Sequence, residues 1–150
     1  MEILALRHGQ SEWNAEGRWQ GQADPPLTSL GEQQALLAAN QLLNSGEIFD
    51  TIASSDLQRA QRTAEIIAEI VGDGVVELRT EFRERLAGSW QGLTRSEIET
   101  LSPGAIEHQQ WPEGYESDES VIGRVMPAIH ELAKTSERLL IVAHSGLIRA

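Results

Sequence analysis

The sequence predicts a three-layer α/β/α domain with a largely parallel central sheet, and three observations lead to this fold class. Short apolar runs, such as residues 3–6 and 139–143, alternate with longer segments in which apolar residues recur at helical spacing. Each run is too short for a helix and is typical of a buried strand. Turns rich in glycine, serine and proline separate the segments, as expected for parallel strands that are connected through helices.

The composition limits the classes of partner. The 150 residues are enough for one domain with a proper core, and 40% hydrophobic with 23% charged residues is ordinary for a globular protein. No apolar stretch reaches the ~18 residues of a membrane span. The formal charge of −11 argues against nucleic acid and anionic membranes as partners. The chain has no cysteine and no secretory signal pattern, so we expect a cytoplasmic protein.

Strands and helices are expected to alternate along the chain. The four strands are short apolar runs that precede polar turns, at residues 3–6, 51–53, 75–78 and 139–143. Helices are expected from Thr28 or Ser29 to Asn44, from Asp56 to Gly72, from Thr94 to Ser102 and through residues 122–133. The segment from Gln10 to Thr28 shows no period and is long for a loop, which is typical of binding loops.

Capping residues and apolar stripes support these helices. Ser29 with Glu32 and Thr94 with Glu97 have the spacing of a capping box, and Asp56 is a natural N-cap. Each long helix has an apolar stripe that we expect to face the core. The stripes are Leu30, Leu36, Leu37, Ala38 and Leu42; Leu57, Ala60, Ala64, Ile67, Ala68 and Val71; and Ile122, Val125, Met126, Ile129, Leu132 and Ala133.

Ionisable residues follow all four strands at their carboxyl ends. Arg7 and His8 follow the first strand and Arg59 follows the second. Glu84 comes after the third strand and His144 after the fourth. Open α/β sheets bind their ligands at this edge, so these side chains are expected to converge on one pocket. Gly9 removes side-chain bulk there, which lets a ligand approach the backbone.

This set of groups suits phosphoryl transfer. Guanidinium and imidazole groups can hold phosphoryl oxygens, and a neutral imidazole can attack phosphorus. A carboxylic acid can protonate the leaving oxygen and, as the carboxylate, later activate water. The spacing of the two histidines and the glutamate is not that of metal ligands. We therefore expect neither a metal nor another cofactor.

Five motifs, in order, resemble the histidine phosphatase family, which includes phosphoglycerate mutases. They are Leu6–Asn14, Pro26–Gly31, Ser54–Ala64, Glu84 with Gly88–Gly92, and Val142–Gly146. The resemblance covers essentially the whole chain and implies a phosphoglycerate mutase-like fold. It implies His8 as the phosphohistidine nucleophile and Glu84 as the proton donor, with a phosphate clamp of Arg7, Arg59 and His144. It further implies substrate contacts from Asn14, Gln20 and Gly21.

Within the family the sequence favours hydrolysis. Ala87 and Trp90 stand where mutases have a tyrosine and a leucine, and the longer mutase insertion after Gly92 is missing. The resemblance thus implies a metal-independent phosphomonoester hydrolase that acts on a small phosphorylated metabolite. Residues 92–105 are similar to the glucosyl-3-phosphoglycerate phosphatase branch, which implies a phosphoglycerate or sugar-phosphoglycerate ester.

Two other functions stay open. Arg95 stands where a mutase holds a substrate-binding lysine, so a cofactor-dependent phosphoglycerate mutase is the first alternative. A non-catalytic phosphate-binding module is the second, although all five site positions hold the reactive residue type. Relatives continue beyond the position of Gly146, so we expect residues 1–150 to be a single histidine phosphatase domain that lacks its C-terminal portion. We expect a small phosphate ester as the partner and leave a homodimer open.

Overall fold

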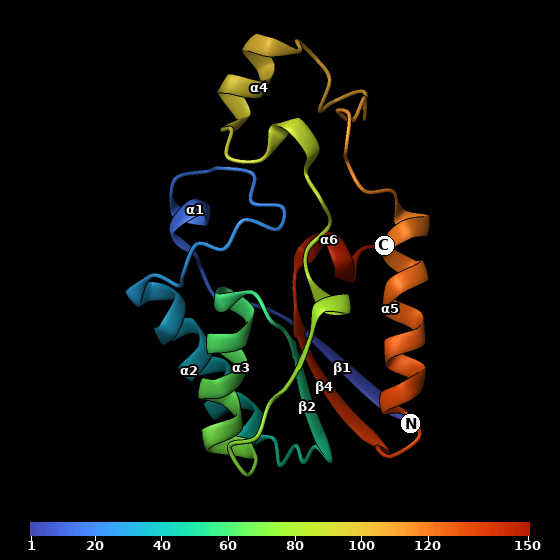
Figure 1. Cartoon of the computed structure of the whole chain (residues 1–150). Coiled ribbons are helices and arrows are strands. Elements are labelled where there is room, and N and C mark those ends of the chain that lie inside the picture. Colours follow the sequence, from blue (N-terminus) through green and yellow to red (C-terminus); the bar gives the residue numbers. More distant parts are fainter.

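The computed structural model describes all residues from 1 to 150 and contains one sheet of four parallel strands. The strands are β1 (Glu2–Arg7), β2 (Thr51–Ser55), β3 (Glu77–Arg79) and β4 (Arg138–Ala143), in the order β1-β4-β2-β3. Helices α2 (Ser29–Asn44) and α3 (Gln58–Val71) cover one face of the sheet, and α5 (Asp118–Leu132) covers the other (Figure 1). The predicted three-layer α/β/α architecture is confirmed.

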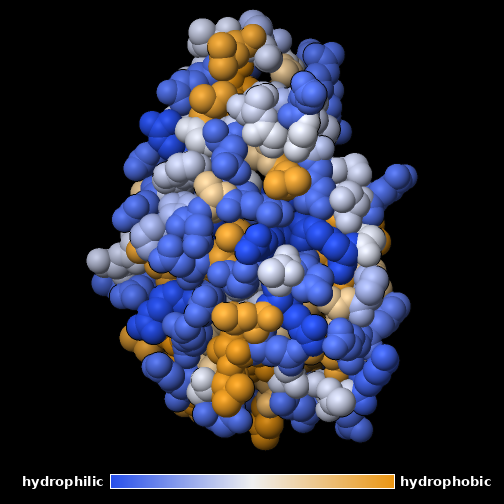
Figure 2. Space-filling model, in the orientation of Figure 1, coloured by the Kyte–Doolittle hydropathy of each residue, from blue (hydrophilic) through white to orange (hydrophobic).

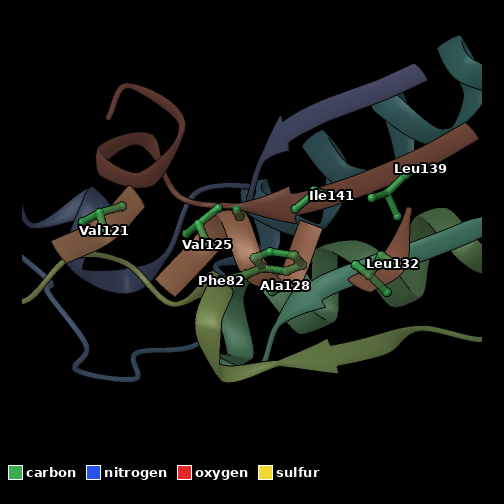
Figure 3. Packing of buried hydrophobic residues seen from close by; sticks show 9 residues of the cluster. Phe82, Val121, Val125, Ala128, Leu132, Leu139 and Ile141 are labelled. Atoms are coloured by element: carbon green, nitrogen blue, oxygen red, sulfur yellow. The ribbon is translucent and has the colours of Figure 1, made fainter. Parts of the chain in front are cut away.

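Strand β4 lies inside the sheet and supplies side chains to both cores. Leu139 and Ile141 join the α5 cluster, in which Phe82 packs between α5 and the sheet (Figure 3). Leu140 and Val142 point the opposite way, into the cluster formed with α2 and α3. Successive side chains of a strand alternate between its two faces, so a strand buried on both faces needs a continuous apolar run. The prediction of a buried strand is correct here.

The same prediction is wrong for β1. This strand pairs only with β4 and forms the edge of the sheet, and both Ile3 and Leu4 remain 38% exposed. An apolar run of four residues indicates a strand but does not tell an edge strand from a central one. Strand β3 also differs, because it begins at Glu77, two residues later than expected.

Two of the three expected helix stripes are displaced. In α2 the buried residues are Gly31, which meets the backbone of Gln10, and Ala35 and Ala39, while the leucines of the expected stripe at 30, 36 and 37 are exposed. In α5 the buried set is Val121, Val125, Ala128 and Leu132, so most of the stripe lies one position earlier. The stripe of α3 is confirmed at Ala60, Ala64, Ile67 and Ala68.

Some of the predicted helix caps are confirmed and others are wrong. The capping box of Thr94 and Glu97 is present at α4 (Arg95–Leu101). Thr28, rather than the Ser29–Glu32 pair, caps α2, because Ser29 is already the first helical residue. Asp56 does not cap α3 and instead forms a bidentate ion pair with Arg83, at 2.7 and 2.6 Å.

Short elements gather at the carboxyl ends of the strands. Helix α1 (Glu12–Ala15) lies in the loop expected to be irregular, α6 (Ser145–Ile148) follows β4, and two 3₁₀ turns, η1 (Thr80–Phe82) and η2 (Gly88–Trp90), lead toward α4. The part that carries α4 stands furthest from the sheet (Figure 1). Hydrophilic residues dominate the surface between this part and the sheet (Figure 2). No helix is long and apolar enough to cross a membrane.

Candidate active site

A cleft of about 400 Å³ opens at the carboxyl ends of the strands. Arg7, His8 and Glu84 line it, as the sequence predicted. Arg59 and His144 are fully buried behind this lining. They are nevertheless close enough for the charge of Arg59 to influence both histidines. The five ionisable residues are therefore brought together in one place.

His8 continues the β1 ladder and presents one free ring nitrogen. Its backbone N–H donates to the carbonyl of Ala143, and its Nδ1 lies 2.6 Å from the carbonyl oxygen of Gly9. A carbonyl can only accept, so Nδ1 carries the proton and Nε2 keeps its lone pair. Burial, together with the charges of Arg59 and Arg7, lowers the pKa of His8 to about 3. The ring is therefore neutral at physiological pH.

Gly9 holds the turn against α2 rather than against a ligand. A Cβ atom at Gly9 would collide with the backbone of Gly31, so the close approach that requires glycine is between two chain segments. The N–H of Gly9 donates to Thr63 Oγ1 at 3.1 Å, and that hydroxyl donates to the carbonyl of Arg59 at 2.7 Å. Thr63 thereby links the turn to α3, and no motif in the sequence singles it out.

His144 is fully buried, and neither of its ring nitrogens has a hydrogen-bond partner. Its ring lies 5.0 Å from that of His8, measured between centroids. Burial first, and then the charge of Arg59, lowers its pKa well below the usual value. A buried polar group without a partner costs about 1–3 kcal/mol. An oxyanion bound between the two histidines would accept the missing hydrogen bond.

Arg59 lies in the first turn of α3, and backbone carbonyls of the Gln10–Thr28 segment hold its guanidinium group. Its Nη1 donates to the carbonyl of Ala23 at 2.7 Å and its Nη2 to that of Gly21 at 3.0 Å. Guanidinium has five N–H donors, so the others remain, including a buried Nε without a partner. Burial lowers the pKa of Arg59 to about 10, which leaves it charged at neutral pH.

The backbone amides at the start of α3 are not all free to hold an anion beside Arg59. The amide of Gln58 is taken by Asp24 Oδ1 at 2.7 Å, so Asp24 caps the helix from the loop. Arg7, in contrast, forms no hydrogen bond or ion pair within the chain and lines the cleft. Arg59 is thus held in place by backbone carbonyls, whereas the guanidinium of Arg7 is free.

Glu84 is oriented by two backbone amides. Its Oε1 accepts from the N–H of Arg85 at 2.8 Å, and its Oε2 accepts from the N–H of Gly146 at 3.0 Å. A Cβ atom at Gly146 would collide with this carboxylate and displace it, so glycine at 146 keeps Glu84 in its present position. Arg124 and Glu116 form an ion pair behind this segment, and Arg124 also contacts the carbonyl of Glu84 at 3.4 Å.

The predicted substrate contacts are placed unequally. Asn14, Gln20 and Gly21 all line the cleft. Arg95 does not line it, because α4 packs through Ile98 into a separate cluster away from the strand ends. Arg95 is exposed on the first turn of α4, and we give it no place in the site. Nowhere in the structure do three or more His, Cys, Asp or Glu side chains form a group that could hold a metal ion.

Comparison with known proteins agrees with this geometry. A sequence profile of the histidine phosphatase superfamily (branch 1) matches residues 3–150. The chain belongs to this superfamily. Its histidine phosphatase fold is also found in solved structures. A mycobacterial glucosyl-3-phosphoglycerate phosphatase in complex with VO3 has a TM-score of 0.87 and 39% identity, covering 96% of this chain and 76% of that one.

Relatives in the superfamily include phosphatases and mutases. The glucosyl-3-phosphoglycerate phosphatase of Mycolicibacterium vanbaalenii is 40% identical, over 99% of this chain and 71% of the relative. A metal-independent phosphoserine phosphatase of Arabidopsis thaliana is 36% identical, over 99% of this chain and 66% of the relative. A 2,3-bisphosphoglycerate-dependent phosphoglycerate mutase of Methylorubrum extorquens is 35% identical, over 99% and 76%.

Proposed function

We propose that this histidine phosphatase hydrolyses small phosphate monoesters through a phosphohistidine on His8. One observation carries the proposal. A neutral imidazole with a free Nε2 lies 5.0 Å, between ring centroids, from a second imidazole whose two nitrogens have no partner. An attacking lone pair beside an unsatisfied N–H donor is the arrangement that phosphoryl transfer requires.

In the first step the lone pair of His8 Nε2 attacks phosphorus and the P–O bond to the leaving group breaks. Glu84, in its protonated form, gives its proton to the departing oxygen. Arg7, Arg59 and His144 donate hydrogen bonds to the phosphoryl oxygens, whose charge they stabilise. Phosphoryl transfer depends mostly on such positioning and charge stabilisation, and the guanidinium groups supply the positive charge.

In the second step water attacks phosphorus and the P–N bond to His8 breaks. Glu84, now a carboxylate, takes the proton of the water, and the Nε2 lone pair is restored. The hydrogen bond from Nδ1 to the carbonyl of Gly9 keeps Nε2 directed at phosphorus in both steps. The residues end in the protonation states in which they began.

We infer that the substrate is a phosphoglycerate or sugar-phosphoglycerate ester. Relatives with 35–40% identity are named for glucosyl-3-phosphoglycerate, phosphoserine and phosphoglycerate, which are all small esters with a carboxylate. The cleft of about 400 Å³ is of the size that holds ligands of this kind. Asn14, Gln20 and Gly21 are the residues we assign to contacts with the leaving group.

A substrate panel with excess EDTA tests the proposal. We expect release of inorganic phosphate from glucosyl-3-phosphoglycerate or 3-phosphoglycerate, undiminished by the chelator, and little formation of 2-phosphoglycerate. The His8→Ala protein is the inactive control, since it keeps the fold and lacks the nucleophile. Strict dependence on a divalent cation, or efficient interconversion of the phosphoglycerates primed by 2,3-bisphosphoglycerate, would contradict the proposal.

A further inference from the structure

Three aromatic side chains line the same cleft and take no part in the phosphoryl chemistry. They are Trp19, Trp111 and Tyr115. Trp111 and Tyr115 are stacked, with centroids 4.6 Å apart and planes 10° from parallel. Trp90, which is buried, contacts Trp19 and Trp111 edge-on at 5.1 and 5.8 Å. Offset stacking and edge-on contacts are the preferred geometries of aromatic pairs, so the group holds itself in place.

Trp111 keeps 44% of its surface exposed in spite of these contacts. Backbone pairing fixes the segment that carries it. The N–H of Ser89 donates to the carbonyl of Glu113 at 3.3 Å, and that of Glu116 donates to Leu86 at 3.0 Å. Ligand pockets commonly combine such a preformed aromatic surface with a few polar groups. An exposed, fixed indole beside a catalytic cleft therefore indicates a ligand that covers it.

The charges of the cleft limit what this ligand can be. Arg85 lies over the ring of Tyr115 at 5.6 Å and is paired with Asp118, and Arg18 is paired with Glu16 and Glu97. Beyond Arg59, the cations of the cleft that lack a carboxylate partner are Arg7 and Arg149. They suit one phosphoryl group and one further carboxylate, and the cleft offers no other unpaired cation for the rest of the ligand.

We propose that the Trp111–Tyr115 stack, together with Trp19, is the binding platform for a sugar ring on the leaving group. A pyranose ring can lay its C–H face on the indole while its hydroxyls reach the amides of Asn14 and Gln20, which line the same cleft. The platform rests on the proposed function, because it selects among esters that the phosphoryl site would hydrolyse. Trp111 is then a specificity-determining residue, and esters without a ring do not use it.

The test compares glucosyl-3-phosphoglycerate with 3-phosphoglycerate, which lacks the sugar. We expect the wild type to prefer the glucosyl ester, and Trp111→Ala to lower kcat/KM about tenfold for that ester alone, the equivalent of about 1.4 kcal/mol. Trp111→Phe should keep most of the preference. Leu101→Ala, which truncates an exposed apolar side chain at the end of α4 and outside the cleft, is the control and should change neither value.

An equal loss of kcat/KM on both esters, with lower thermal stability, would indicate that Trp111 has a packing role and would overturn the platform. No loss of kcat/KM on either ester would overturn it as well. A preference for a nucleoside monophosphate that disappears in Trp111→Ala would replace the sugar with a base. If the wild type hydrolyses no ester, the proposed function fails instead. Calorimetric binding to His8→Ala, with and without Trp111→Ala, still tests the platform, and equal affinities for the glucosyl ester would refute it.

Discussion

At the scale of single residues, the two neutral imidazoles of His8 and His144 have different hydrogen-bonding environments. The Nδ1–H of His8 donates a hydrogen bond to the carbonyl of Gly9, and its Nε2 stays free. His144 has no hydrogen-bond partner for either ring nitrogen. Burial, with a further contribution from nearby guanidinium charge, keeps both rings unprotonated. A protonated ring could not attack phosphorus. Burial therefore keeps the proposed nucleophile in its reactive form, and the charges of Arg59 and Arg7 add to this effect.

Glu84→Gln tests the proposed acid and base directly. Glutamine keeps the size of the side chain but can neither release nor accept the proton. General acid–base help contributes roughly 10²–10⁴-fold, so hydrolysis of alkyl phosphate esters should slow by that order. The loss should be smallest for p-nitrophenyl phosphate, whose leaving group hardly needs protonation. Equal losses on both ester types in steady-state assays would remove Glu84 from the role of acid.

The sequence predicts the reactive residues better than the groups that hold them. His8, Arg59 and His144 follow predicted strand ends, so topology alone brings them together. Thr63 and Asp24 are visible only in the structure, because their contacts to Gly9 and Gln58 join segments far apart in sequence. Arg95 was assigned from its position in the motif, and only the placement of α4 shows that it lies outside the cleft.

At the scale of elements, the ion pair of Arg124 and Glu116 joins α5 to the segment that carries Glu84. The carboxylate of Glu116 is 7% exposed, and it also accepts from the N–H of Leu86 at 3.2 Å. Hydrogen bonds from Arg124 are the main reason that the pKa of Glu116 is lowered. The pair therefore stabilises the fold above the unfolded pKa of this carboxyl, and the stabilisation is lost as the pH falls through the folded pKa.

Glu116→Gln measures this link. We expect the free energy of unfolding at pH 7 to fall by about 2 kcal/mol, in the range for hydrogen bonds to charged groups. The difference from the wild type should shrink below about pH 4.5, the ordinary value for glutamate. Urea denaturation at several pH values provides the data, with the exposed Glu119→Gln as the matched control. A difference that persists unchanged at pH 3 would contradict this role.

Helix existence is predictable from the sequence, but the buried face is not. The predicted stripe of α3 is correct because this face packs against β2 and β4, with Ile52, Leu140 and Val142 in the same core cluster. In α2, which packs against α3 and the turn at Gln10, the buried residues are Gly31, Ala35 and Ala39 rather than the leucines. The spacing of hydrophobic residues does not reveal a helix face that is buried because its residues are small.

At the scale of the whole molecule, the active site lowers stability in acid. The folded pKa of His8 is about 3 and the unfolded value is 6.5, so only the unfolded chain takes up the proton between them. Stability is therefore lost as the pH falls from 6.5 toward 3. From pH 7 to pH 5, His8 alone accounts for about 2 kcal/mol. The protein is destabilised in acid because His8 stays neutral in the folded state.

His8→Gln separates this effect from general acid unfolding. Between pH 7 and 5 the wild type should lose about 2 kcal/mol more unfolding free energy than the variant, because glutamine takes up no proton. Chemical denaturation at the two pH values measures both losses. Inorganic phosphate, which we expect to bind the folded site, should raise the unfolding free energy of the wild type at both pH values. Identical losses in the two proteins would show that His8 is not buried in the neutral form.

The parallel sheet and its order of layers follow from the sequence, since alternating strands and helices leave few other topologies. The place of β1 at the sheet edge does not follow, because the residues of an edge strand and a central strand can be equally apolar. The aromatic platform was also missed, since Trp111 and Tyr115 lie in a segment without any period. Their stacking depends on contacts to Trp90 from a distant turn.

The central claim is that His8 carries the phosphoryl group, and trapping that intermediate tests it most directly. Wild-type protein mixed with a phosphate ester and quenched with base within milliseconds should carry a base-stable, acid-labile phosphoryl group. Mass spectrometry of the peptides should place it on His8, and the His8→Ala protein should carry none. A phosphoryl group on a serine, an aspartate or His144, or turnover by His8→Ala at the wild-type rate, would contradict the account.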